Sequence, residues 1–257
     1  MGLIAVGSLK GRPGVTTTAL ALAICWPQEV LPTVVECDPS GGDIAANWRL
    51  HSRPGLTDVA AAAAEFGTGD PEAVEDGVQT ITAGGVELRV VCAAPGGAGV
   101  RSALPTIAAP GAKILDRPGA WTVADCGRLD WGSAAWPIAT AADATLLVVE
   151  GSLAGVAHLR SRAGDLRQAE ALGARLAVAV APGEYAAEEV ADLLLAADVN
   201  LQVLGALGPA KPIGPDPLTW RRRHALKPWR ALAQALLEVA EAPEQLAITD
   251  TSIEAER

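Results

Sequence analysis

Apolar runs alternate with Ala- and Leu-rich stretches along most of the chain. The apolar runs predict strands at residues 3–8, 33–37, 120–126, 144–150, 175–181 and 201–207. Two further β-like runs within residues 79–94 flank Gly84 and Gly85, which predicts a hairpin. The Ala- and Leu-rich stretches predict helices at residues 16–25, 56–65, 153–171, 185–197 and 224–241, and another at 100–116 interrupted by Pro105 and Pro110.

This order of elements predicts an α/β fold with three layers. Strands that alternate with helices form a doubly wound, mainly parallel sheet with helices on both faces. Half of the residues are hydrophobic and only 4% are aromatic, which favours Ala-rich helices packed on buried strands over a β-sandwich. We expect one domain over residues 1–242 and an acidic, flexible tail at 243–257.

The loop between the first strand and the first helix, "SLKGRPGVTTTAL" at residues 8–20, has the composition of an anion site. The N–H groups of such a loop converge on a helix N-terminus that carries partial positive charge. Gly11 and Gly14 allow close approach to a phosphate, and Thr16 and Thr17 offer hydroxyls to Mg²⁺ and to a phosphate. The pattern GxxxxGK[ST] is not met, because Leu9 replaces the first glycine and Val15 the lysine. The loop alone therefore leaves a nucleotide site and an unrelated glycine turn both open.

"KGRPGVTTTAL" resembles the deviant loop KGGxGKTT of the ParA/MinD family of P-loop ATPases. Arg12 and Val15 depart from that pattern. The resemblance implies a P-loop NTPase fold and ATP with Mg²⁺ as cofactors. It implies a nucleotide site formed by Lys10, Gly11, Arg12, Pro13, Gly14, Val15, Thr16 and Thr17. It also implies a homodimer, in which Lys10 reaches across to the nucleotide of the partner.

Two more stretches carry the resemblance. "TVVECDPSGGDIAANWRLHSRPGLTDVA" at residues 33–60 looks like the second strand of the family and its following loop, with Glu36 and Asp38 at the two acidic positions. "WTVADCG" at residues 121–127 looks like Walker B. The resemblance implies that Lys10 and Asp38 are catalytic, with Asp38 orienting the attacking water. It further implies that Thr16 and Asp125 hold Mg²⁺, Asp125 through water.

The missing loop lysine, together with "GDIA", "GLTDV" and residues 144–167, resembles the TadZ/CpaE branch of the family. Members of that branch are associated with localising and assembling the Tad pilus secretion machinery. The resemblance implies an ATP-gated dimer with slow or negligible ATPase activity that positions a secretion, pilus or conjugation apparatus. A DNA-partitioning ATPase and a nucleotide-free scaffold remain as alternatives.

Charge and composition bear on nucleic-acid binding, on the cellular compartment and on metal or membrane sites. The net charge of −10 argues against a chain that coats nucleic acid, yet "TWRRRHALKPWR" at residues 219–230 is a basic cluster suited to DNA, lipid or protein contact through residues 220–230. The four cysteines form no CxxC pair, which favours buried thiols in a reducing, cytoplasmic environment. The three histidines have no metal-ligand spacing, and no apolar stretch is long enough to span a membrane.

Overall fold

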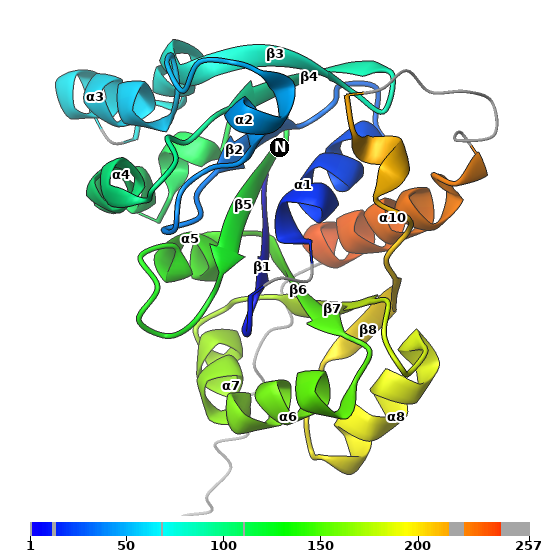
Figure 1. Cartoon of the computed structure of the whole chain (residues 1–257). Coiled ribbons are helices and arrows are strands. Elements are labelled where there is room, and N and C mark those ends of the chain that lie inside the picture. Colours follow the sequence, from blue (N-terminus) through cyan, green and yellow to red (C-terminus); the bar gives the residue numbers. More distant parts are fainter. Residues whose placement is uncertain (1, 12–13, 68, 110, 216–223, 243–257) are drawn as a thin grey trace, which may run out of the picture.

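The computed structural model describes residues 2–11, 14–67, 69–109, 111–215 and 224–242. One eight-stranded sheet, in the order β3-β4-β2-β5-β1-β6-β7-β8, runs through the molecule (Figure 1). Its strands are β1 (Leu3–Ser8), β2 (Thr33–Glu36), β3 (Val78–Ala83), β4 (Val86–Val91), β5 (Thr122–Arg128), β6 (Ala144–Glu150), β7 (Leu176–Ala181) and β8 (Gln202–Ala206). All pairings are parallel except that of β3 with β4, the predicted hairpin at the sheet edge.

Helices cover both faces of this sheet, which confirms the predicted doubly wound fold (Figure 1). One face packs against α1 (Val15–Ile24) and α10 (Lys227–Glu241). The other face packs against α3 (Leu56–Phe66), α4 (Ala98–Ala108), α5 (Trp136–Ala141), α6 (Leu153–Ser161), α7 (Ala163–Ala171) and α8 (Ala187–Ala196). The short helix α2 (Ile44–Trp48) and the 3₁₀ turns η1 (Pro71–Gly77), η2 (Lys113–Leu115) and η3 (Lys211–Ile213) complete the described elements.

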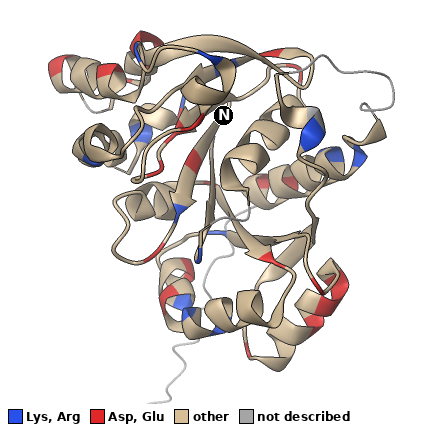
Figure 2. Ribbon diagram, viewed as in Figure 1, with Lys and Arg blue, Asp and Glu red and all other residues tan. Residues whose placement is uncertain are grey.

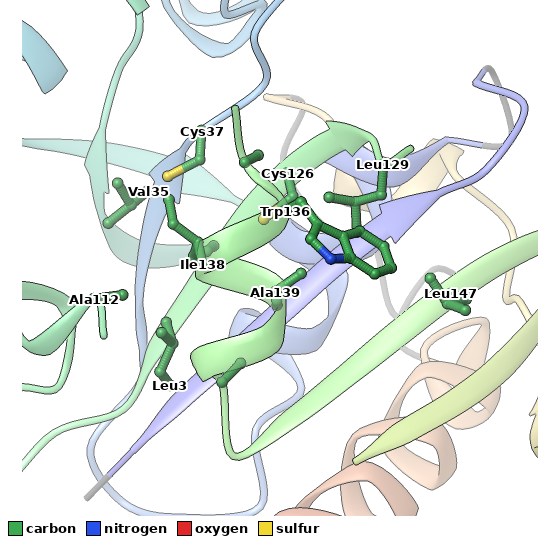
Figure 3. Packing of buried hydrophobic residues seen from close by; sticks show 14 of the residues in the cluster. Leu3, Val35, Cys37, Ala112, Cys126, Leu129, Trp136, Ile138, Ala139 and Leu147 are labelled. Carbon is green, nitrogen blue, oxygen red and sulfur yellow. The ribbon is translucent and has the colours of Figure 1, made fainter. Parts of the chain in front are cut away.

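The strands form because their apolar side chains are buried on both faces of the sheet, as in other covered parallel sheets. Every residue of β1 is buried, and its side chains alternate between the two core clusters, with Leu3 and Ala5 in one and Ile4 and Val6 in the other. Figure 3 shows the cluster that contains Leu3, where strand residues meet side chains of α5.

Two helical predictions differ from the structure. Helix α4 continues through Pro105, because Leu104 and Ile107 on either side are completely buried and packing outweighs one missing N–H bond. The helix predicted over residues 153–171 is broken at Arg162. The hydroxyl of Ser161 donates to the carbonyl of His158 at 2.9 Å, and this carbonyl is the acceptor that an uninterrupted helix offers to the N–H of Arg162.

The carboxyl ends of the parallel strands all lie at the same end of the sheet, between the two core clusters. There the strand order reverses: β1 has β5 and then β2 on one side and β6 on the other. Open α/β sheets bind ligands in the crevice at such a reversal point. The predicted tail at 243–257 lies outside the described residues. None of the helices that the structure describes is both long and apolar enough to cross a bilayer.

Candidate nucleotide-binding site

A cleft of about 830 Å³ opens at the carboxyl end of β1, where the strand order reverses. Four segments that are distant in the sequence form its walls. They are the β1–α1 loop with the start of α1, the loop after β2 with α2, the end of β5, and the loop after β8. The sequence-predicted residues that line it are Gly11, Gly14, Val15, Thr16, Thr17 and Asp38. The predicted residues Arg12 and Pro13 lie outside the described residues.

The loop backbone has the conformation that its glycines predict. Gly11 and Gly14 have φ of +81° and +80°, in the left-handed region where a side chain is strained. Ser8, completely buried at the end of β1, accepts a hydrogen bond from the N–H of Gly11 at 3.0 Å. The carbonyl of Gly14 accepts the N–H of Thr18 at 2.9 Å and begins α1. The loop thus leads directly into a helix N-terminus that faces the cleft.

Val15 is the first residue of α1 and is only 7% exposed. Its side chain belongs to the core cluster that also contains Ile4 and Val6, and it lines the cleft as well. The position that carries a lysine in GxxxxGK[ST] therefore presents an apolar wall to the cleft. No charge reaches the cleft from this position.

Thr16 lines the cleft and pairs with Asp125, which is 1% exposed and does not itself line the cleft. The hydroxyl of Thr16 donates a hydrogen bond to the carboxylate of Asp125, and the N–H of Gly127 donates to Asp125 Oδ1 at 3.2 Å. Burial is the main cause that raises the pKa of Asp125 to about 7, and the nearby carboxylates Glu36 and Asp38 raise it further. A divalent cation next to this pair would favour the charged form of the carboxyl.

Asp38 lies beside this pair and is held by its own loop. Its Oδ1 accepts the N–H of Ser40 at 2.8 Å, and its carbonyl accepts the N–H of Gly41 at 2.9 Å. Gly127 has φ of +57°, and a Cβ built on it would lie 2.0 Å from the Asp38 carboxyl carbon. A glycine at position 127, near the end of β5, is therefore required for Asp38 to occupy this position.

Glu36 has a structural role that the sequence did not reveal. It is 1% exposed, and its two carboxylate oxygens accept the N–H groups of Asp43, Ile44 and Ala93 at 2.7–2.9 Å. These bonds join the loop after β2 to the end of β4. Burial raises the pKa of Glu36, while the three N–H groups oppose that shift. Glu36 thus fixes the loop that carries Asp38.

Lys10 does not line the cleft. It is exposed and lines a neighbouring cavity of about 730 Å³, together with residues of β6 and α6 such as Glu150 and His158. Gly11 lines both hollows. The two predicted catalytic residues, Lys10 and Asp38, are therefore not brought together around one hollow within a single chain.

Further cleft residues were not predicted as site residues. They are Ser8, Leu20, Ser40, Asp43, Asn47, Trp48, Gly127, Arg128, Ala210, Ile213, Gly214 and Pro215. The loop after β8 could have been expected from its position alone, because the carboxyl end of every parallel strand reaches the same edge of the sheet. Helix α2 is too short to give a periodic signal, so Asn47 and Trp48 carried none.

Other sequence predictions have mixed outcomes. All four cysteines are free and buried, as expected. Among the described residues no group of His, Cys, Asp or Glu side chains is arranged to hold a metal ion by itself. In the basic cluster at 219–230, residues 219–223 lie outside the described residues. Trp229 is 1% exposed and donates to the carbonyl of Pro209, so it belongs to the core.

Solved structures share this fold. MinD, a cell division ATPase of Pyrococcus furiosus, is 18% identical with a TM-score of 0.64 over 93% of this chain and 100% of its own. An ATP complex of a Cyanothece McdA variant is 18% identical, with a TM-score of 0.63 over 92% of this chain and 96% of its own. Cobyrinic acid a,c-diamide synthase of Mycobacterium smegmatis, solved with an ATP analogue and magnesium, is 18% identical, with a TM-score of 0.64 over 94% of this chain and 96% of its own.

No protein-family model and no curated protein sequence matches the chain. At these identities the likeness establishes a common fold with ParA/MinD-type ATPases. The likeness covers almost the full length of both chains.

Proposed function

We propose that this chain binds ATP with Mg²⁺ in the cleft at the carboxyl end of β1 and acts as an ATP-gated dimer with slow or negligible hydrolysis. One observation carries the proposal. Gly11 and Gly14 in left-handed conformation, the N-terminus of α1, Thr16 bonded to the buried Asp125, and Asp38 meet around one cleft. Proteins of the same fold hold ATP or an ATP analogue with magnesium.

Each group of cleft residues has its own role in the proposed function. The N–H groups in the first turn of α1 bind phosphate oxygens, because they lie at the positive end of the helix. Thr16 and Asp125 form the side that holds the metal. Mg²⁺, when bound, neutralises phosphate charge as a Lewis acid. Asp38 lies 2.8 Å from one backbone N–H and faces the cleft, where it accepts a hydrogen bond from the attacking water.

Val15 is the reason to expect slow turnover. A hydrogen bond to a charged group contributes about 1.5–3 kcal/mol, and the apolar Val15 side chain cannot donate one to the β- and γ-phosphates. Phosphoryl transfer depends on positive charge around the γ-phosphate. The loop N–H groups and Mg²⁺ still bind the phosphates, so the loss affects hydrolysis more than binding.

The position of Lys10 supports the dimer. Its exposed side chain lies outside the cleft of its own chain and beside the neighbouring cavity. In the family that the loop resembles, the corresponding lysine serves the nucleotide of the partner. We therefore assign Lys10 to the partner's phosphates, where a charge buried by association contributes about 2–5 kcal/mol.

The cellular part of the proposal rests on sequence resemblance. The sequence resembles the TadZ/CpaE branch in its valine at position 15 and in the stretches "GDIA" and "GLTDV". By this resemblance the dimer would act in the cytoplasm and position a secretion, pilus or conjugation apparatus. The basic residues within 220–230 favour DNA partitioning as the second candidate. The net charge of −10 opposes it, and Glu188, Glu189 and Asp192 form an exposed acidic cluster on α8, visible in red in Figure 2.

Sedimentation with and without Mg-ATP tests the proposal. We expect the parent and the Lys113→Ala control, which removes an exposed lysine in η2, to dimerise with Mg-ATP. We expect Lys10→Ala to stay monomeric and folded, since an exposed loop lysine contributes little to stability. A parent that remains monomeric with Mg-ATP contradicts the proposal. Salt-sensitive binding of the parent to random duplex DNA would instead support partitioning.

A further inference from the structure

The described lining of the cleft has an unusual charge balance for a phosphate site. Asp38 and Asp43 contribute two carboxylates, and Val15 contributes none of the positive charge expected at its position. Among the lining residues that the structure describes, Arg128 is the one cation. An ATP molecule entering the cleft would therefore meet repulsion from these carboxylates, and within the described lining of one chain Arg128 is the side chain that offsets it.

An irregularity in β5 turns Arg128 toward the cleft. Val6 pairs with Asp125 and Ser8 pairs with Arg128, so β5 has one more residue than β1 over this interval. Such a bulge reverses the facing of every following residue. Leu129 accordingly enters the core beside Trp136, as Figure 3 shows, and Arg128 lies on the cleft face.

The stem of Arg128 also lies near Gly11 of the phosphate-binding loop. A Cβ added at Gly11 would lie 3.8 Å from Arg128 Cδ, so the stem lies next to the loop at the distance of one further carbon atom. The Arg128 side chain is 58% exposed, and its Nε lies 3.6 Å from Asp130 Oδ2. That separation is long for a charge-assisted hydrogen bond, so the pair is weak and the guanidinium remains able to turn to another anion.

We propose that Arg128 substitutes for the missing loop lysine and binds the phosphate chain of the nucleotide from β5. The proposal rests on the proposed function, because it assigns a residue to the same cleft. An arginine is suited to this role, because its planar guanidinium donates to two phosphate oxygens at once and stays charged at every physiological pH. The lysine of the GxxxxGK[ST] pattern and Arg128 of this chain are then two alternative ways to place one positive charge at the phosphates.

Calorimetric titration of Mg-ATP into four forms of the full chain tests this substitution. They are the parent, Arg128→Gln, the matched control Arg160→Gln on the exposed side of α6, and Arg128→Gln combined with Val15→Lys. We expect Arg128→Gln to weaken binding about ten-fold, as one charge-assisted bond at a half-exposed site implies, and Arg160→Gln to bind as the parent does. We expect the same substitution to weaken binding less than about three-fold when Val15→Lys is present.

Each outcome distinguishes the two proposals. Equal affinity of Arg128→Gln and the parent overturns the part assigned to Arg128 and leaves the nucleotide site intact. An equal loss with and without Val15→Lys also overturns it, because independent groups are additive. Absence of Mg-ATP binding by the parent overturns the proposed function itself. Thermal unfolding of each variant verifies that the fold is retained.

Discussion

Val15→Lys is expected to raise the affinity for Mg-ATP by about one to two factors of ten. Val15 begins α1 at the edge of the cleft, so an ammonium on a four-carbon stem reaches the region of the phosphates. Hydrogen bonds to a charged group contribute about 1.5–3 kcal/mol, which corresponds to roughly 10- to 150-fold in affinity. We expect the lower part of this range, because Arg128 already provides positive charge in the same cleft.

The same substitution has a cost in folding stability. Val15 is 7% exposed within a core cluster, and complete burial of a valine stabilises a fold by about 1.5–3 kcal/mol. A lysine stem that leaves the cluster for the cleft recovers part of this contact, so we expect a loss of about 1–2 kcal/mol.

Val15→Met is the matched control for this experiment, because it is linear and similar in length but uncharged. Calorimetry with Mg-ATP measures affinity, and urea unfolding measures stability. Equal affinities of the lysine and methionine variants would refute the reasoning, since the ammonium would then not reach the phosphates.

Three further substitutions test the other cleft residues. Thr16→Ala is expected to weaken binding of ATP with Mg²⁺ more than without it, because it removes a metal ligand; equal calorimetric losses in both conditions would separate the hydroxyl from the metal. Asp38→Ala is expected to slow any hydrolysis and leave ATP affinity unchanged or slightly higher, and unchanged phosphate release would show that another group orients the water. Asp125→Asn is expected to flatten the pH dependence of the free energy of unfolding. Folding raises the pKa of Asp125 from about 3.9 to about 7, so the protonated carboxyl stabilises the fold at low pH. This stabilisation is lost as the pH rises through 7. Urea unfolding at pH 5 and pH 8 measures this, and the same difference between the two pH values in parent and variant would contradict it.

The fold could be predicted because its signals are local and repeated. Each parallel strand is a short apolar run, and β1 and β6 begin and end where the sequence places them. The helices with clear Ala and Leu content were found as well. The prediction failed where a tertiary contact overrides the local pattern, as in α4, where buried Leu104 and Ile107 carry the helix through Pro105.

The candidate site was predicted in part, for a related reason. Gly11, Gly14, Thr16 and Thr17 lie in one contiguous loop, so their spacing is visible in the sequence. Arg128 enters the cleft only because a bulge in β5 changes its facing, and such a register shift has no sequence pattern of its own.

Titration of Mg-ATP into the full chain tests the central claim most directly, with Gly14→Val as the control. The account predicts saturable binding with about one nucleotide per chain in the parent. It predicts loss of that binding in Gly14→Val, because Gly14 has φ of +80° and a β-branched residue there distorts the loop that binds phosphates. The absence of saturable binding in the parent, or equal binding by a folded Gly14→Val variant, would contradict it.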